Sequence, residues 1–401
     1  MLSIKKLYKI GPGPSSSHTM GPKNAVEYIL NTYPQVDYVE MVFYGSLAET
    51  GRGHLSDYIA EKTFKDVPHK IIFDYDTKTK HPNTMVFTLY KNNEIFKKVT
   101  ILSIGGGLIK VLNQKNIKEE DTYPHKTFDQ IKKYCIENSL TLIEYIYRFE
   151  KEDINEYIEN IYRVMMNSIE SGLSKEGVLP GKLKVRRKAK ELYEYHIENE
   201  SEDFKEKRLI SAYAFAVSEE NASGELIVTA PTCGASGVIP SLVKYSEDRG
   251  YAHQTIIEGL LIAGLIGLIV KENASISGAE CGCQAEVGTA TSMGAAFLAY
   301  LDGQNIYGIE RASEIAMEHS LGLTCDPIDG YVQIPCIERN AVGALRSIAT
   351  NSLSILMGTT NSKISFDIVV KTMYKTGKDL NRSYKETSKG GLAKTYEKDN
   401  G

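Results

Sequence analysis

Hydrophobic and polar positions along the chain follow two different periods, and the change falls after about residue 112. Between about 36 and 112, β-branched and aromatic residues alternate with polar ones in "VDYVEMVFYGSLAETG", "HKIIFDYD", "TMVFTLYK" and "EIFKKVTILSIGGG". Alternation of this kind is typical of half-buried strands, and polar or glycine turns separate the segments. The glycines of "SIGGG" at 103–107 are predicted to end a strand in a turn. A helical stretch at 22–33 precedes the strands.

From about residue 127 the apolar positions recur with helical spacing, beginning with "FDQIKKYCIENSLTLIEYIYRFE", and helices are predicted to near 380. The most apolar run, "GLLIAGLIGLIV" at 259–270, is too short to span a bilayer and is bounded by charged residues. We interpret it as a buried helix. The pattern predicts an N-terminal α+β domain over 1–150, followed by a mostly α-helical domain over 151–401.

Composition and charge restrict the classes of partner. The formal net charge is -4 and the pI is about 6.1, with Lys and Arg scattered along the chain, so nucleic acid is not an expected partner. The N-terminal stretch "MLSIKKLYKIGPGP" has no long apolar segment and does not resemble a signal peptide. We therefore expect a cytoplasmic protein without a membrane partner. The chain has 6 cysteines, and in that compartment metal binding or inert burial is expected rather than a disulfide framework.

The segment "GPGPSSSHTMGP" at 11–22 combines hydroxyls, a histidine, glycines and prolines immediately before a helix. Such composition is typical of a solvated loop. A serine- and glycine-rich loop that leads into a helix also presents free backbone N–H groups to an anion. No G-K-[ST] follows at the spacing of a phosphate-binding P-loop, so a carboxylate is as plausible a ligand as a phosphate.

Two histidines, His18 and His54, lie in glycine-rich loops, the second of them in "YGSLAETGRGHLSD" at 44–57. The intrinsic pKa of a histidine suits general acid–base catalysis. The alternative is that each imidazole only braces its own loop. The other histidines lie in helical or polar contexts, and we assign them no role.

Cysteines lie beside proline and glycine in "TAPTCGASGVIP" at 229–240 and in "LTCDPIDGYVQIPCIERNA" at 323–341. The spacing of Cys325 and Cys336 fits no zinc-finger pattern. Iron–sulfur clusters are held by cysteine thiolates, normally four, and a cluster that takes part in chemistry can leave one iron without a protein ligand. Three thiolates then suffice, and the candidates for the third are Cys233, Cys281 and Cys283. Cys135 lies in an amphipathic helical segment and is expected to be buried and inert.

These segments occur together and in order with "SIGGG", "GVLPGKL", "SISGAECGCQAEVG" and "TMYKTGKDLNRSYKETSKGGLA". The chain resembles, over nearly its whole length, the single-polypeptide iron–sulfur-dependent L-serine dehydratases (L-serine ammonia-lyases) of bacteria. The resemblance implies an α+β domain and a helical domain that holds a 4Fe-4S cluster. It also implies conversion of L-serine to pyruvate and ammonia without pyridoxal phosphate, with the cluster as Lewis acid.

The resemblance further implies that the "SSSHT" and "GSL…GH" loops face the cluster across the domain boundary. On this basis His18 or His54 is the expected base. The residues expected to bind the substrate are Ser15, Ser16, Ser17 and Thr19, which would hold the carboxylate, together with Ser46, Gly105 and Gly106. The expected cluster ligands are Cys233, Cys325 and Cys336.

The glycine loop departs from the family pattern at one position. Where that pattern has a ligand cysteine after "APT", this chain has Ser236 in "PTCGASG". Cys233, in the same proline turn, is the expected replacement. A serine oxygen at Ser236 should bind iron more weakly, and the absence of a cluster is the third alternative. Cys281 and Cys283 are expected first as buried thiols and only then as reserve ligands.

Two other functions are compatible with the same residues. One is an enzyme without a standard cluster that acts on another β-substituted amino acid, such as L-cysteine or L-threonine. The other is a protein that binds serine as a sensor and does not catalyse. A two-domain enzyme with a long helical half is also expected to form a homodimer.

Overall fold

The computed structural model describes residues 1–113, 120–358 and 362–400. The chain forms two compact units. One comprises Gly11–Lys118 with Ala222–Leu226, and the other comprises Met1–Ile10, Glu119–Asn221 and Ile227–Gly401. The division therefore falls earlier than the expected boundary at 150, because the segment after residue 119 packs with helices. The first ten residues also join the helical unit, where the Met1 amine donates to the Tyr123 carbonyl at 2.6 Å.

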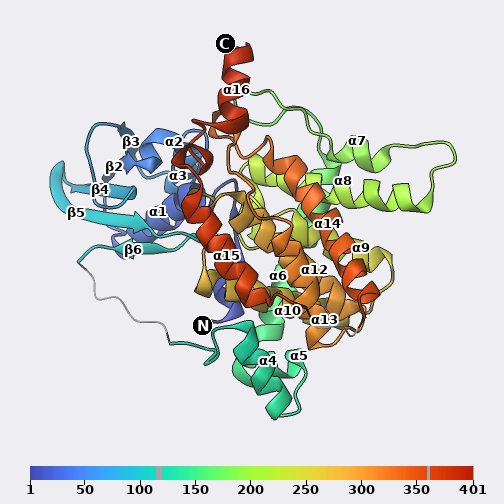
Figure 1. The fold of residues 1–401 in the computed structure, drawn as a ribbon. Coiled ribbons are helices and arrows are strands. Elements are labelled where there is room, and N and C mark those ends of the chain that lie inside the picture. The colour runs from blue at the N-terminus through green and yellow to red at the C-terminus, as the bar shows by residue number, and fades with distance from the viewer. Residues whose placement is uncertain (114–119, 359–361, 401) are drawn as a thin grey trace. The chain divides into compact units, whose positions relative to one another are not determined.

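The smaller unit is built on a mixed five-stranded sheet with the order β3-β2-β4-β5-β6 (Figure 1). Strands β2 and β3 pair in parallel, and the other neighbours are antiparallel. The strands are β2 (Tyr38–Gly45), β3 (His69–Asp74), β4 (Asn83–Lys91), β5 (Glu94–Ser103) and β6 (Ile109–Val111). The predicted glycine turn after Ser103 is confirmed, with Gly105, Gly106 and Gly107 all at positive φ.

The alternating apolar residues of β2 and β4 form the core of this unit. Met41 lies opposite Phe87 and Phe43 lies opposite Met85, and all four are fully buried. Helices α1 (Gly21–Thr32), α2 (Ser46–Thr50) and α3 (Ser56–Phe64) contribute further residues to the same cluster. Helices α2 and α3 lie inside the stretch expected to be strand-like. They form because apolar residues such as Ala60 and Phe64 of α3 recur at helical spacing and are buried in the cluster.

The larger unit consists mostly of helices. In chain order these are α4 (Phe128–Glu137), α5 (Leu142–Phe149), α6 (Ile154–Ser174), α7 (Ala189–Glu194), α8 (Glu202–Ala222), α9 (Val238–Asp248), α10 (His253–Asn273), α11 (Gly278–Cys281), α12 (Thr289–Leu301), α13 (Ile306–Glu318), α14 (Cys336–Leu356), α15 (Phe366–Asp379) and α16 (Gly391–Asn400). Strand β1 (Lys9–Pro12) pairs with β7 (Leu226–Thr229), and the division between the units passes through both. Polar caps begin several helices, as where Thr141 and Glu144 form a capping box on α5.

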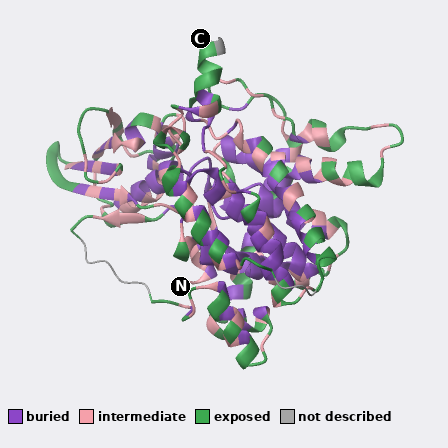
Figure 2. Cartoon of the chain, in the orientation of Figure 1, coloured by how far each residue is buried: buried purple, intermediate pink, exposed green. Residues whose placement is uncertain are grey.

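Two apolar helices, α10 and α12, form the centre of the helical unit. Every residue of α10 from Gly259 to Val270 is buried, and α12 packs against α10, α13 and α14. Figure 2 shows this buried centre in purple. By length and composition α10 is the one helix of the described residues that could cross a membrane, but it is a core helix here. The predicted buried helix is confirmed, as is the fold class of an α+β region followed by a largely helical one.

Candidate active site

The loop after β1 enters a single turn of π-helix at Ser16–Met20 that leads directly into α1. The Ser15 hydroxyl caps this turn by accepting a hydrogen bond from the His18 backbone N–H at 3.2 Å. π-turns often mark functional sites because they re-aim side chains within a helical segment. Here the turn places the imidazole of His18 in the interior of the smaller unit, where the residue is 6% exposed.

Three donors from distant parts of the same unit hold the carbonyl groups of the π-turn. The Gly107 N–H donates to Ser16 at 3.0 Å, and the Ser103 hydroxyl donates to Ser17 at 2.8 Å. The Ser56 hydroxyl donates to the carbonyl of His18. The end of β5 and the start of α3 therefore fix the backbone that carries the histidine.

His18 and His54 lie side by side, with ring centroids 4.8 Å apart. Nδ1 of His18 lies 2.8 Å from the Ser17 hydroxyl, and its Nε2 lies 3.0 Å from the Ser46 hydroxyl. Nδ1 of His54 lies 3.0 Å from the carbonyl oxygen of Thr50, which can only accept. Nδ1 of a neutral His54 therefore carries the proton, and the lone pair of the ring is on Nε2.

Burial keeps both imidazoles neutral. It lowers the pKa of His18 to about 3, and the nearby His54 contributes to that shift. Burial also lowers the pKa of His54, although the hydrogen bond to Thr50 opposes the change. A neutral imidazole has a lone pair that can accept a proton, whereas binding an anion would favour a ring that is already protonated, so the pair suits a base.

The expected substrate-binding residues divide into two groups in the structure. The hydroxyls of Ser15 and Ser17 lie 3.4 Å apart, and Ser17 and Ser46 contact opposite sides of the His18 ring. Thr19 is fully buried, and its hydroxyl donates to the His54 carbonyl at 2.7 Å and accepts from the Ser15 N–H. Thr19 therefore ties the two histidine loops together.

Ser16, Gly105 and Gly106 lie outside that hydroxyl group. Ser16 meets the glycine turn through its backbone, because its carbonyl accepts from the Gly107 N–H. Gly105 and Gly106 have open space where a Cβ would lie, so the turn leaves room beside the backbone.

The helical unit brings the cysteine-bearing loops together through one carboxamide, that of Asn340 on α14. Its Nδ2 donates to the carbonyls of Gly234 and Cys336, and its Oδ1 accepts from the Gly237 N–H, each at 2.8 Å. The glycine loop between β7 and α9 is thus fastened to the N-terminal turn of α14, which begins at Cys336. Sequence reasoning missed this role, although Asn340 lies in the "IERNA" segment.

Cys325 is held from both sides by its backbone. Its N–H donates to the Tyr384 carbonyl at 2.8 Å, and its carbonyl accepts from the Glu386 N–H at 2.7 Å. Its thiol lies 3.9 Å from the Glu286 carboxylate, which belongs to the π-turn Gln284–Gly288. Glu286 and Glu386 were not assigned from the sequence, and only their position among the cysteines distinguishes them from other glutamates.

The electrostatic surroundings of the thiols show which cysteines group together. Burial raises the pKa of Cys325 and of Cys336 well above the ordinary value, and negative charge on Glu286 and Cys283 raises both further. Burial raises the pKa of Cys283 to about 11, opposed by the guanidinium of Arg339, which donates to its sulfur. Burial and the charge of Glu286 raise the pKa of Cys233. Cys283 is therefore an electrostatic neighbour of both Cys325 and Cys336, and Glu286 is a neighbour of Cys233, Cys283, Cys325 and Cys336.

The glycine loop contains a second polar group of interest. Ser236 is 1% exposed, and its hydroxyl has no hydrogen-bond partner among the described residues. An unsatisfied buried hydroxyl is costly, and such groups point to a missing ligand, ion or water. Ser236 and Cys233 are joined within one turn by the hydrogen bond from the Ser236 N–H to the Cys233 carbonyl at 3.1 Å.

These residues fit a cysteine-bound cluster better than a single metal ion. Within the described ranges, no three His, Cys, Asp or Glu side chains converge as ligands of one ion would. A cluster takes one thiolate per iron, so its ligands need not converge on one point. Gly278 packs tightly against this group, because a Cβ there would lie only 3.0 Å from the Cys325 sulfur and 2.5 Å from a Glu286 oxygen.

Comparison with known proteins agrees with the order of the two regions. The family profile described as the serine dehydratase beta chain matches residues 3–61, and that of the serine dehydratase alpha chain matches residues 74–393. A protein of Haemophilus influenzae named L-serine dehydratase is 39% identical, over 98% of this chain and 99% of its own length. L-serine dehydratase 2 of Escherichia coli is 37% identical, over 98% of both chains.

The expected family and enzyme class, a lyase, are thereby confirmed. The beta-chain and alpha-chain regions, which are separate family profiles, follow one another here in a single polypeptide. With matches that extend over almost the whole sequence, the chain belongs to the serine dehydratase family.

Proposed function

We propose that this protein is a cytoplasmic L-serine dehydratase that uses a 4Fe-4S cluster to convert L-serine to pyruvate and ammonia. The observation that carries the proposal is the match of almost the whole chain to this family, together with the contact of 3.9 Å between the Cys325 thiol and the Glu286 carboxylate. Relatives of nearly full-length similarity are named for the same activity.

Cys325 and Cys336 are two proposed ligands, and the third is Cys283 rather than Cys233. The reason is electrostatic, because Cys283 raises the pKa of both other thiols. Three cysteine ligands leave one iron open, and when bound such a cluster supplies Lewis-acid chemistry that makes the substrate hydroxyl a better leaving group. Cys233 and Ser236 then lie in the adjoining glycine loop, which Asn340 holds through Gly234 and Gly237.

The smaller unit supplies the proposed base and the carboxylate-binding groups. Nε2 of His54 accepts the Cα proton, because the hydrogen bond of Nδ1 to Thr50 directs the lone pair to that atom. With a pKa near 3, His18 is a weak base at neutral pH, and we assign it to positioning through Ser17 and Ser46. The hydroxyls of Ser15, Ser17 and Ser46 donate to the substrate carboxylate, with backbone groups near Ser16, Gly105 and Gly106 at the edge of the site.

The atoms of the reaction balance without an added oxidant or reductant. Loss of the Cα proton and of the β-hydroxide removes one water and forms aminoacrylate. Aminoacrylate tautomerises to the imine, and hydrolysis of the imine consumes one water and releases ammonia and pyruvate. Since a pocket discriminates weakly against one added methyl group, slow turnover of L-threonine is also expected.

The test is anaerobic purification followed by reconstitution with iron and sulfide. Visible absorption at about 400 nm and pyruvate formation from L-serine are measured on the same sample. Brown, active protein supports the proposal, and the Cys325→Ala/Cys336→Ala double variant should lose both signals. Colourless protein that binds L-serine without turnover would instead support the sensor function, and preferential turnover of L-cysteine would overturn the assigned substrate.

A further inference from the structure

Arg339 is a cation that lies among the cysteines of the helical unit. Cys336 begins α14, and Arg339 follows it by three residues, so the two side chains share one face of the helix. Only 21% of the Arg339 side chain is exposed. A positive charge is unfavourable near the N-terminus of a helix, because the helix dipole is positive there. Residues that break such a local rule are concentrated at functional sites, where other contacts compensate.

The guanidinium of Arg339 holds the segment that carries Cys325. Its Nη1 donates to the carbonyl of Thr324, and its Nη2 lies 3.4 Å from Oδ1 of Asp326. Thr324 and Asp326 flank Cys325 in the chain, so the guanidinium holds the segment on both sides of that cysteine. Arg339 also donates to the sulfur of Cys283. One planar group therefore connects the start of α14 to two other cysteine-bearing segments.

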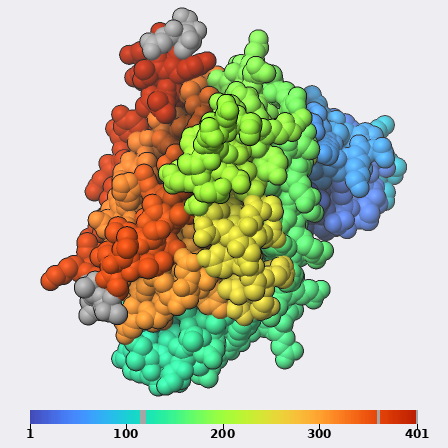
Figure 3. All heavy atoms as spheres, turned by 90° about the vertical axis from the view of Figure 1, so that its right-hand side faces the viewer, coloured from blue at the N-terminus to red at the C-terminus, as the bar shows by residue number. Residues whose placement is uncertain are grey.

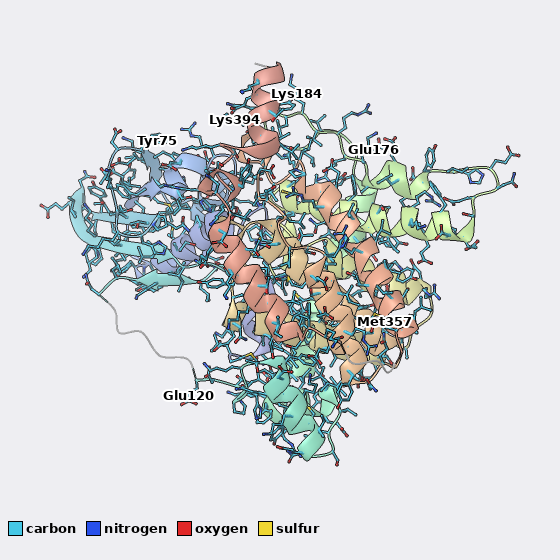
Figure 4. The ribbon with its side chains drawn as sticks, viewed as in Figure 1. Tyr75, Glu120, Glu176, Lys184, Met357 and Lys394 are labelled. Carbon is cyan, nitrogen blue, oxygen red and sulfur yellow. The ribbon has the colours of Figure 1, made fainter. Side chains whose placement is uncertain are left out.

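The carboxylate of Asp326 links this group to the C-terminal helix. Its Oδ1 also accepts from the Thr324 hydroxyl at 3.0 Å, and its Oδ2 accepts from the Leu392 N–H at 2.8 Å. Leu392 lies in the first turn of α16, the helix that carries Lys394 in Figure 4. In Figure 3 the red C-terminal part of the chain lies at the surface. The hydrogen bonds of Asp326 and Arg339 therefore connect a surface helix to buried thiols.

The positive charge of Arg339 also offsets negative charge at the thiols. Burial raises the pKa of Cys283 and of Cys336, and the charge of Arg339 opposes both shifts. Burial also raises the pKa of the Glu286 carboxyl, again opposed in part by Arg339. A buried negative group is costly unless a cation or hydrogen bonds compensate it. Arg339 supplies that compensation from a helix whose backbone is fixed.

From these contacts we propose that Arg339 is a positioning residue for the cysteine ligands. It fixes residues 324–326 to the start of α14 and places a positive charge beside the thiolates. An arginine suits both tasks, because its planar fork donates in several directions and stays charged, whereas a lysine is a point charge. The inference rests on the proposed cluster and adds a residue outside its ligand set. The alternative is an ion pair with Asp326 that stabilises the fold alone.

Two substitutions separate the position of the guanidinium from its charge. Arg339→Gln removes both, and the reconstituted protein should lose its cluster to an iron chelator about tenfold faster than the wild type, a typical effect for groups that support metal ligands. Its cluster should also have a lower midpoint reduction potential, because a positive charge beside it is lost. Arg339→Lys keeps the charge without the planar fork, so the potential should stay near that of the wild type while the cluster is still lost faster. Arg346→Gln, two turns further along α14, is the control and should change neither property.

Hydrogen exchange of the protein without iron tests the positioning by itself. In Arg339→Gln the amides of Cys325 and Leu392 should exchange at least about tenfold faster than in the wild type, because both lie in segments that Arg339 and Asp326 hold together. Arg346→Gln should leave both exchange rates unchanged. If Arg339→Gln does not fold, Arg339→Lys carries the same comparisons of exchange and chelation.

The outcomes distinguish this inference from the proposed function. If the wild-type protein binds no cluster, the proposed function fails, and the exchange rates still decide whether Arg339 holds the cysteine segment. If the wild type binds a cluster and Arg339→Gln changes neither the chelation rate nor the potential, the inference is overturned while the proposed function stands. Unchanged exchange at Cys325 and Leu392 also overturns it. A loss of thermal stability alone would make Arg339 a structural ion pair, against the proposal.

Discussion

The imidazole ring of His54 packs against that of His18, with 4.8 Å between the ring centroids and an angle of 35° between their planes. The same pair is connected through the main chain, because Thr19, next to His18, donates its hydroxyl to the His54 carbonyl. A substitution at either histidine is therefore expected to change the packing of the other ring. The proposed division into a base and a positioning residue can be tested because the two rings differ in their hydrogen bonds.

Replacing His54 by Asn should lower kcat by about 100-fold or more, since general-base catalysis typically contributes that much. Cluster absorption should stay unchanged, because His54 belongs to the smaller unit and the cysteines to the helical one. His18→Asn should instead alter KM as well as kcat. His196→Asn, at an exposed position, is the control and should keep full activity. Equal activity of His54→Asn and the control would show that His54 is not the base.

The buried histidines should make the protein less stable in mild acid. The pKa of His18 is about 3 in the folded protein and 6.5 as an ordinary value. The unfolded chain binds the extra proton between these values, so stability is fully present above pH 6.5 and is lost as the pH falls toward 3. For His18 alone the loss at pH 5 is about 2 kcal/mol.

Denaturant unfolding at pH 7 and pH 5 measures this effect. A His18→Gln variant is less stable at pH 7 if packing is lost, but its stability should change less between the two pH values than that of the wild type. An equal pH dependence in both proteins would show that His18 does not titrate differently on folding.

Serine substitution distinguishes the candidates for the third cluster ligand. After anaerobic reconstitution, Cys283→Ser should lose at least about half of its iron and acid-labile sulfide, because a hard oxygen replaces a thiolate. Cys233→Ser, the matched change in the glycine loop, should keep both. The opposite result would return the ligand role to Cys233, as expected from the sequence.

The carboxamide of Asn340 should stabilise the glycine loop and the start of α14 together. Asn340→Asp keeps the shape but loses both N–H donors, leaving the carbonyls of Gly234 and Cys336 without their partner. We expect a loss of about 1–3 kcal/mol in the free energy of unfolding. Asn305→Asp is the control, because Asn305 caps α13 and aspartate caps a helix equally well. If both variants lose the same free energy of unfolding, the hydrogen bonds of Asn340 stabilise the protein no more than the helix cap at Asn305 does.

A faster loss of the cluster to an iron chelator in Asn340→Asp would show that the Asn340 side chain also positions Cys336, the proposed ligand. The free energy of unfolding and the rate of iron chelation report different properties, so the substitution could change one and leave the other unchanged. An unchanged chelation rate would confine the role of Asn340 to the fold.

Much of the fold could be predicted because it depends on local periodicity. The helix expected at 22–33 is α1 at Gly21–Thr32, and the helix expected from 127 begins with α4 at Phe128. Helices α2 and α3 were missed within the strand-rich stretch, since they are short and flanked by glycine-rich segments. The compact units divide at residue 118, whereas the predicted domain boundary is at 150, because the pattern of α4 and α5 alone does not show which core they join.

The sequence by itself determined the family, the order of an α+β region and a helical region, and the loops that carry His18, His54 and Cys325. Long motifs and regular hydrophobic spacing are properties of neighbouring residues, so they can be recognised without a structure. Only the tertiary structure decided that the Thr19 hydroxyl is bonded to the His54 carbonyl, that Asn340 joins two cysteine loops, and that Cys283 is an electrostatic neighbour of Cys325 and Cys336. Those relationships join residues far apart in the chain, and burial and hydrogen bonding arise only once the chain has folded.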